Sequence, residues 1–241
     1  EDGRAALHVA AMLGRAGSVK ELIEAGADLK ARDKKGKTFG HWAVEAGHVE
    51  VLKSVEAQCG KEKLKEFVRE KNNDGLTCAH AASAVGQVDV LRYLKEACGE
   101  ELLREKNNDG ETCAHGACAG GQLKVLRYLK ATCGEGLLKE KSSEGKTCAL
   151  TASLGGQLEA LRYLGETCGK ELLAEKDDDG MTCAHAASEG GHLDMLRYLQ
   201  EMCGEELLRE KDKHGFTCAQ RASWGGLLGI VDYLKSLGIN E

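Results

Sequence analysis

Apolar residues in this chain fall into two kinds of short segment separated by glycine-containing turns. Residues 72–75, Asn-Asn-Asp-Gly, have the composition of a turn, because glycine adopts positive φ freely and Asn and Asp bond to nearby backbone. Thr77 then stands at a helix N-cap position, before the small residues of 78–82. A second segment, residues 88–97, carries apolar residues on one helical stripe. The pattern predicts a unit of helix, turn, helix and loop.

This unit recurs along the whole chain. The turn glycines lie 33, 39, 35, 35, 35 and 35 residues apart, at Gly3, Gly36, Gly75, Gly110, Gly145, Gly180 and Gly215. One helix pair cannot bury its apolar stripe alone, so such units must stack, and about three are needed for stability. We therefore expect an all-α solenoid of seven stacked repeats. The expected single domain covers residues 1–241, with units at 1–33, 34–72, 73–107, 108–142, 143–177, 178–212 and 213–241.

Close stacking requires small side chains between neighbouring helices. Alanine holds one position of the first helix in every unit, namely Ala10, Ala43, Ala82, Ala117, Ala152, Ala187 and Ala222. We expect this alanine column to be buried between adjacent first helices.

The repeated unit resembles the ankyrin repeat. Its pattern is Gly-x-Thr-Cys-Ala-His-x-Ala followed by Gly-His or Gly-Gln, and the family hallmark is Thr-Pro-Leu-His, Ala-Ala and Gly-His. The first unit matches best, with Leu7-His8-Val9-Ala10-Ala11 and a 33-residue length. The resemblance covers essentially the whole chain. It implies a non-catalytic module that binds other proteins through its concave face and loop tips.

The units depart from that family in two ways. Cys stands where the family has Pro, and most units carry two extra residues in the segment equivalent to 98–106. We expect this insertion to form an extra helical turn, with Leu102 and Leu103 beneath the second helix. Unit two is longer still, and residues 61–69 should add a further turn.

Charge and hydropathy exclude several functional classes. Lys and Arg number 33 and Asp and Glu 39, so the net charge of −6 offers no electrostatic footprint for a phosphate backbone. Nucleic acid is therefore not an expected partner. Charged residues interrupt every apolar run well short of the ~18–20 residues of a membrane span, so membrane insertion is not expected either.

The beginning of the chain and its thiols bear on its compartment. The chain starts at Glu1 without an apolar signal segment, which indicates a fragment or a processed product. We expect a reducing intracellular compartment, with the cytoplasm first and an organelle interior as the alternative.

Eleven cysteines make the chain cysteine-rich. Most lie in two columns, one at the start of the first helices and one at the end of the second helices. Three interpretations are open: disulfides, a metal site, or reduced thiols that pack as small apolar groups. The odd count argues against disulfides, and Cys-x-His pairs do not share a helix face as metal ligands would. We favour reduced packing thiols and expect neither metal nor cofactor, although an exposed thiol at a helix N-terminus could be reactive.

The histidines also form a column, His8, His41, His80, His115 and His185. The family resemblance implies that they tie adjacent turns together by hydrogen bonds. Leu150 and Gln220 hold the same position in two units, so a titrating group there is dispensable. Residues 177–180, Asp-Asp-Asp-Gly, lack the closing ligands of a calcium loop and are a turn. No catalytic constellation stands apart from the repeat, and we expect no enzyme activity.

Positions that vary between repeats are free to serve binding. Three columns vary in this way: the residue after the turn glycine and two positions in the first helix. The ankyrin resemblance implies that all three face the hairpin tips and the concave groove. The candidates for partner binding are Met181, Phe216, Trp224, Leu154, Trp42, Met12 and Leu76. Large apolar side chains that the fold does not need to bury are typical of interfaces. The alternative is that they cover the open ends of the stack, and the first unit is expected to lack a polar outer face.

Two functions from different classes follow. The first is a protein-binding scaffold or adaptor, working as a monomer or within an assembly. The second is a structural subunit of a larger complex, which would explain apolar residues at both ends. A redox-responsive module that uses the cysteine columns is a distant third.

Overall fold

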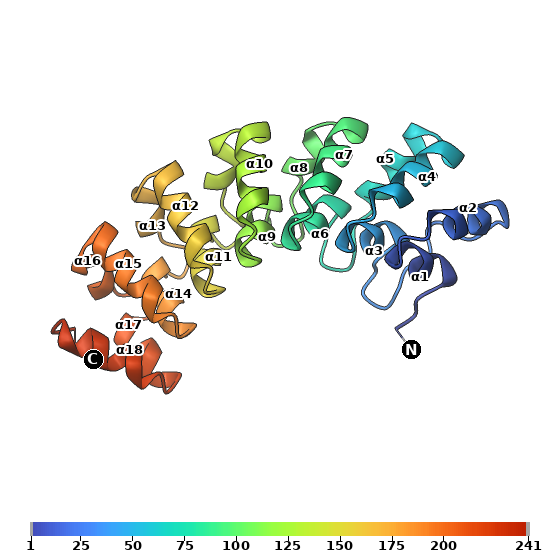
Figure 1. Cartoon of the computed structure of the whole chain (residues 1–241). Coiled ribbons are helices and arrows are strands. Elements are labelled where there is room, and N and C mark those ends of the chain that lie inside the picture. Colours follow the sequence, from blue (N-terminus) through green and yellow to red (C-terminus); the bar gives the residue numbers. More distant parts are fainter. Residues whose placement is uncertain (1, 240–241) are drawn as a thin grey trace. The chain divides into compact units, whose positions relative to one another are not determined.

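The computed structural model describes residues 2–239, which form eighteen α-helices, one 3-10 helix and no β-strand (Figure 1). The predicted all-α fold class is therefore confirmed. The chain divides into two compact units between Gly116 and Ala117. The expectation of one domain over residues 1–241 stays a prediction.

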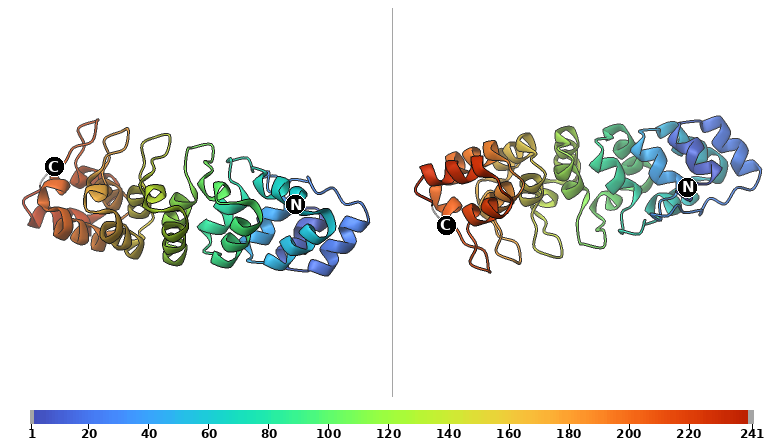
Figure 2. Two further views of the ribbon diagram at one scale, coloured as in Figure 1. Left: turned by 90° about the horizontal axis from the view of Figure 1, so that it is seen from above. Right: turned by 90° about the horizontal axis from the view of Figure 1, so that it is seen from below.

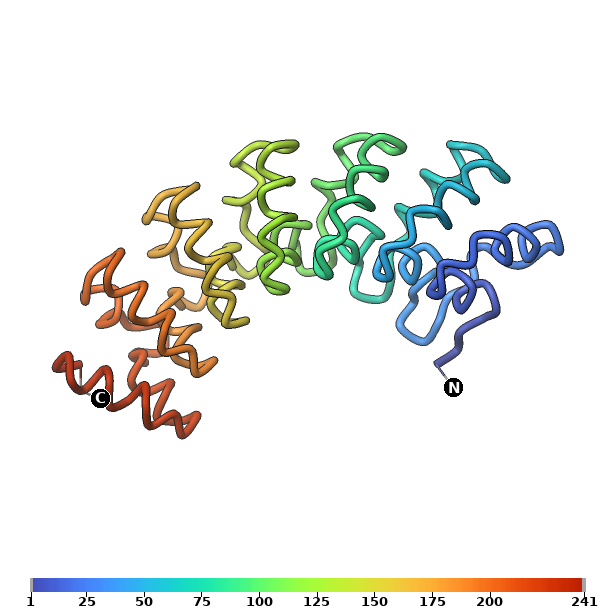
Figure 3. The backbone as a smooth tube through the Cα atoms, viewed as in Figure 1, coloured from blue at the N-terminus to red at the C-terminus, as the bar shows by residue number. Residues whose placement is uncertain are grey.

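Each repeat contributes a pair of main helices, which the tube in Figure 3 traces along the chain. The first compact unit contains the pairs α1 (Ala6–Met12) and α2 (Ala16–Glu24), α3 (Phe39–Glu45) and α4 (Val49–Cys59), and α6 (Cys78–Ala84) and α7 (Val88–Cys98). The second contains α11 (Cys148–Leu154) and α12 (Leu158–Cys168), α14 (Cys183–Glu189) and α15 (Leu193–Cys203), and α17 (Cys218–Trp224) and α18 (Leu228–Ser236). The division between the units falls within α9 (Cys113–Ala119), and α10 (Leu123–Cys133) belongs to the second unit.

The turn before α6 shows how the sequence produces the repeat. Asn72 Oδ1 accepts hydrogen bonds from the backbone N–H groups of Asp74 and Leu76, at 3.0 and 2.9 Å. Gly75 lies between them with φ of 78°, and a Cβ atom there would come within 2.3 Å of Asn108 Oδ1 in the next turn. A larger residue would therefore both strain the backbone and collide. Within each unit these turns project from the same side of the helices (Figure 2).

The core of each compact unit lies between its stacked helix pairs. First helices pack on first helices, α1 on α3 and α3 on α6 in one unit, and α11 on α14 and α14 on α17 in the other. The alanine column is buried in both units, as predicted: Ala82 and Ala187 are 0 % exposed and Ala10 is 7 %. Second helices contribute fully buried leucines such as Leu91 and Leu94. Many small contacts therefore replace one large aromatic core.

The inserted residues after the second helices form short helices of their own. These are α5 (Lys61–Arg69), α8 (Glu101–Arg104), η1 (Glu135–Lys139), α13 (Glu171–Ala174) and α16 (Glu205–Arg209). Leu102 and Leu103 are 0 % exposed, with α8 packed on α7 and α6. In the longer α5, Phe67 is buried with its ring 6.0 Å from that of Phe39. Both predictions about the insertions are confirmed.

Candidate functional site

A threonine and a histidine at the start of a first helix form a network that links one repeat to the next. At the start of α3 the backbone N–H of the N-cap residue Thr38 donates to His41 Nδ1 at 3.2 Å, and Thr38 Oγ1 lies 3.0 Å from the same nitrogen. His41 Nε2 donates to the carbonyl oxygen of Leu76 at 2.8 Å. Because Nδ1 accepts from an N–H group, the ring is neutral and its proton lies on Nε2.

The same arrangement recurs in both compact units. Burial lowers the pKa of His41, His80 and His185, and that of His80 falls to about 4. Where histidine is absent the cap changes: Thr147 Oγ1 accepts from the Leu150 N–H at 3.1 Å. The remaining links run from His8 to Lys37 O, from His80 to Glu111 O and from His185 to Phe216 O, while His115 Nδ1 accepts from Thr112 N. These rings hold backbone groups in place rather than facing a cavity.

The first polar residue of the turn is a second anchor, which the turn composition alone did not reveal. Asp33 Oδ1 accepts from the backbone N–H groups of Lys35 and Lys37, both at 2.8 Å, and its Oδ2 accepts from Trp42 Nε1 at 3.1 Å. Asp212 repeats this geometry, but its Oδ2 accepts from the guanidinium of Arg221. A carboxylate at this position can therefore fix the side chain nine residues later.

Nine of the eleven cysteines are buried. Burial raises the pKa of Cys183 and Cys218 to about 12, and that of Cys168 to about 11. Desolvation of the thiolate therefore outweighs any stabilisation by a helix N-terminus, which was the route to a reactive thiol considered from the sequence. Cys59 and Cys203 are the half-exposed members.

The second helices carry a row of cation–aromatic contacts between consecutive repeats. In the second compact unit the guanidinium of Arg127 lies over Tyr163, at 5.8 Å from the ring centroid, and that of Arg162 lies over Tyr198, at 4.6 Å. Arg162 also pairs with Glu159, three residues earlier on the same helix, at 4.0 Å. Exposed pairs at this spacing contribute only a few tenths of a kcal/mol, so the cation–aromatic contacts are the feature that links one repeat to the next.

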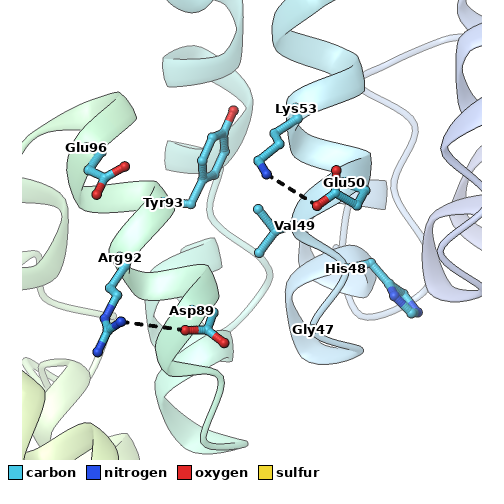
Figure 4. A pocket seen from close by; sticks show the side chains of 9 residues that line it. All are labelled: Gly47, His48, Val49, Glu50, Lys53, Asp89, Arg92, Tyr93 and Glu96. Carbon is cyan, nitrogen blue, oxygen red and sulfur yellow. Dashed lines mark hydrogen bonds and ion pairs between the residues drawn. The ribbon is translucent and has the colours of Figure 1, made fainter.

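A groove of about 460 Å³ lies between the second helices α4 and α7 of the first compact unit (Figure 4). Its charged side chains pair locally, Lys53 with Glu50 at 3.3 Å and Arg92 with Asp89 at 3.9 Å. The Tyr93 hydroxyl donates to Glu56 at 2.5 Å and closes one wall. Exposed pairs of this kind contribute little and select no particular ligand.

The first helices expose one position in both units, and several predicted binding residues occupy it. The exposed members in this column are Ala84, Ala119, Leu154, Glu189 and Trp224. Trp224 is 68 % exposed and Leu154 is 47 % exposed. Because interior repeats also expose this position, the exposure of Trp224 does not depend on its place in the last repeat.

Two of the predicted residues are in contact. The rings of Phe216 and Trp224 have centroids 4.3 Å apart and planes at 64°. Met181 is the residue of the preceding repeat that is equivalent to Phe216, and it is half-buried. Glu189 stands between Leu154 and Trp224 in the exposed column, so a charged side chain interrupts the apolar residues there.

Trp42, in contrast, is held by the protein itself. Arg4 and Lys37 lie over its ring, at 4.4 and 4.9 Å from the centroid, and Asp33 accepts its indole N–H. Arg4 also donates to the sulfur of Met12 at 3.5 Å. The remaining candidate, Leu76, is half-buried, and its carbonyl oxygen is bound by His41. These three candidates in the first compact unit thus share in intramolecular contacts.

The first repeat has an open face between α1 and α2, a groove of about 600 Å³. Val9 and Leu13 are 40 % and 50 % exposed there. Ser18 also lines this groove, although the equivalent Val51 and Val90 of the next repeats are buried. The expectation that this face lacks polar groups is therefore only partly met.

Membrane-spanning helices and metal-binding clusters are both absent from residues 2–239. No helix of this described part has the length and apolar character to cross a bilayer. The same residues contain no cluster of three or more His, Cys, Asp and Glu side chains arranged to hold a metal ion.

Comparison with known proteins identifies the repeat. The family model described as "Ankyrin repeats (3 copies)" matches residues 1–63, 55–135 and 165–241. An ankyrin repeat protein of Rickettsia bellii (strain RML369-C) is 41 % identical to the chain over 61 residues. That match covers 23 % of this chain and 32 % of the relative, so the chain spans about a third of the relative's length. With family matches over most of its residues and the stacked helix pairs described above, the chain belongs to the ankyrin repeat family.

Proposed function

We propose that this chain is a non-catalytic scaffold or adaptor that binds a partner protein through the concave face and loop tips of its ankyrin repeats. Ankyrin repeats are in general protein–protein interaction modules. The observation that carries the proposal is the exposed indole of Trp224 in the first-helix column. This indole rests on the ring of Phe216, which lies in the preceding turn. An exposed tryptophan on a rigid support can act as an anchor worth about 2 kcal/mol or more in an interface.

The binding surface of this proposal is the first-helix face of the second compact unit. We define it by Met181, Glu189, Phe216, Arg221 and Trp224. The candidates near α1 and α3 belong to the proposal with less support, because the Trp42 ring already carries two of the protein's own cations. The proposal includes one continuous domain over residues 1–241 and a reducing intracellular environment. Reduced thiols such as those of Cys59, Cys183 and Cys203 support that environment.

A structural subunit of a larger assembly is the second candidate. Leu228 favours it, because this residue is 72 % exposed on α18, while the equivalent Leu158 and Leu193 are only half-exposed. A neighbouring subunit that covers the end of the stack would bury Leu228 without contacting the first-helix face.

The two candidates are separated by capture of partner proteins on the immobilised full chain. We expect Trp224→Ala to reduce capture about tenfold or more, because the indole anchor is lost. Leu228→Ala is the matched control, since it also removes an exposed apolar side chain. Capture that survives Trp224→Ala but is lost with Leu228→Ala would replace the scaffold proposal with the subunit. Capture unchanged by both would place the interface elsewhere.

A further inference from the structure

Charged groups beside the Trp224–Phe216 pair form a closed network. Arg221, one turn before Trp224 on α17, directs Nε and Nη2 at Asp212 Oδ2, at 3.1 and 2.5 Å. Its Nη1 donates to Glu189 Oε2 at 3.1 Å. The Arg221 side chain is only 15 % exposed, and that of Asp212 is fully buried. All three nitrogens of the guanidinium therefore face carboxylates of the protein itself.

The network has a consequence for the sign of a partner's charge. Although Arg221 lies on the binding face, each of its three nitrogens already donates to a carboxylate and the side chain is only 15 % exposed, so it offers little to an acidic partner. Glu189 differs, because its side chain is 51 % exposed and only Oε2 binds Arg221. A carboxylate that is half-exposed beside an apolar anchor retains accepting capacity for an incoming cation.

The turn before Met181 adds negative charge to the same face. Asp178 and Asp179 are exposed at its tip. Asp177 is buried, and its Oδ1 accepts hydrogen bonds from the backbone N–H groups of Asp179 and Met181. Lys213 and His214 occupy the tip of the following turn. The carboxylates available to a partner thus lie on the Met181 and Glu189 side of the aromatic pair.

The aromatic ring itself also favours a cation. Within the first compact unit, Arg4 and Lys37 both lie over the Trp42 ring, within 5 Å of its centroid. Trp224 has a comparable ring and leaves 68 % of its surface open. The open ring therefore adds to the attraction that the Glu189 carboxylate offers to a cation on this face.

We propose that the partner segment presents a large apolar side chain to Trp224 and Phe216, together with an adjacent Lys or Arg directed at Glu189. This inference rests on the proposed function and specifies its partner as a basic, apolar peptide segment. Apolar contact supplies the anchor, and the carboxylates of this face select the charge beside it.

The test uses two short synthetic peptides that share one phenylalanine between glycines and differ only in flanking Lys or Glu residues. Binding to the full chain is followed by the fluorescence of Trp224, with Trp42→Phe introduced so that one tryptophan reports. We expect the Lys peptide to bind at least about fivefold more tightly than the Glu peptide, in low salt. Glu189→Gln should reduce this preference to about twofold or less, since Asp212 still holds Arg221. Glu201→Gln, on the outer helix α15, removes the same charge away from the face and should leave the preference unchanged.

The outcomes separate this inference from the proposed function. Equal binding of both peptides, or tighter binding of the Glu peptide, overturns the charge preference while leaving Trp224 as an anchor. A preference that survives Glu189→Gln, or falls equally with Glu201→Gln, also overturns it. Binding of neither peptide at millimolar concentration overturns the inference, and the capture experiment with Trp224→Ala then decides the proposed function by itself.

Discussion

The ring of Phe216 supports the indole of Trp224, with ring centroids 4.3 Å apart and planes at 64°. Phe216 belongs to a turn and Trp224 ends the helix that follows it. The pair leaves most of the indole exposed, so the contact positions the tryptophan without burying it.

Trp224→Ala should therefore cost little stability. An aromatic pair contributes about 0.5–1.5 kcal/mol, so we expect a loss of about 1 kcal/mol in the free energy of unfolding, measured by urea titration. A loss above about 3 kcal/mol would instead mark Trp224 as a cap on the last repeat, because core aromatic truncations cost that much. Phe216→Ala, which removes a half-buried ring, provides the comparison.

The histidine links predict a pH dependence. The pKa of His80 is about 4 in the folded chain, well below its ordinary value near 6.5, and burial also lowers the pKa of His41 and His185. Below about pH 6.5 the unfolded chain binds protons that the folded chain does not, so stability is full above that pH and falls toward pH 4. His80 contributes a slope of up to about 1.4 kcal/mol per pH unit within this window, and His41 and His185 change stability in the same direction.

The control for that prediction follows from a repeat that has glutamine in place of the histidine. Gln220 occupies the histidine position, and its Oε1 accepts from the Thr217 N–H at 3.0 Å. A chain with His41→Gln, His80→Gln and His185→Gln should lose most of the change in urea midpoint between pH 7 and pH 5. An unchanged pH profile would mean that the three rings titrate alike in both states.

Ala82 and Ala84 test the stacking of first helices within one helix, α6. Ala82 is 0 % exposed between neighbouring helices, whereas Ala84 is exposed. Ala82→Leu should destabilise the chain by about 1–3 kcal/mol through overpacking. Ala84→Leu should stay within about 0.5 kcal/mol of the parent in the same urea titration. Equal effects would contradict the assignment of the alanine column to the core.

Alanine substitutions at Gly75 and Gly99 distinguish the cost of backbone strain from the cost of a steric collision. Both have positive φ, 78° and 91°. A Cβ on Gly75 would meet Asn108, while nothing lies within 4 Å of one on Gly99. Gly99→Ala should cost about 1 kcal/mol from strain alone, and Gly75→Ala clearly more. The difference in urea midpoints measures the close approach of consecutive turns.

Thiol accessibility tests the packing of the cysteines. We expect a thiol reagent at neutral pH to modify Cys59 and Cys203 in the folded chain, and the nine buried cysteines only on unfolding. Rapid modification of Cys183 or Cys218 would revive the redox alternative, because their raised pKa values predict inert thiols. Peptide mapping after a short pulse of reagent identifies the modified residues.

Much of the fold was predictable from the sequence because the determining interactions recur in register. The turn at 72–75, the cap at Thr77 and the buried Leu102 and Leu103 each depend on neighbours close in the chain or on the next copy of the same unit. Such relationships recur in most copies of the repeat, so comparison of the copies removes local ambiguity.

The candidate site was less predictable. Trp42 and Trp224 look alike in the sequence, as large aromatic residues in variable columns. Only the structure shows that two cations and Asp33 engage one of them, while the other remains open. The contacts of Arg221 with Asp212 and Glu189 join residues nine and 32 positions away.

The sequence by itself determined the repeat, its helices, its turns and the family resemblance, because these follow from periodic patterning and local propensity. Only the tertiary structure decided which side chains of the variable columns already contact other parts of the chain and which remain available to a partner. Stacking brings each variable side chain beside the side chains of the next repeat. Whether a ring or a carboxylate remains available to a partner therefore depends on which residue the next repeat has at that place. Such pairings differ from repeat to repeat, so the periodic pattern carries no record of them.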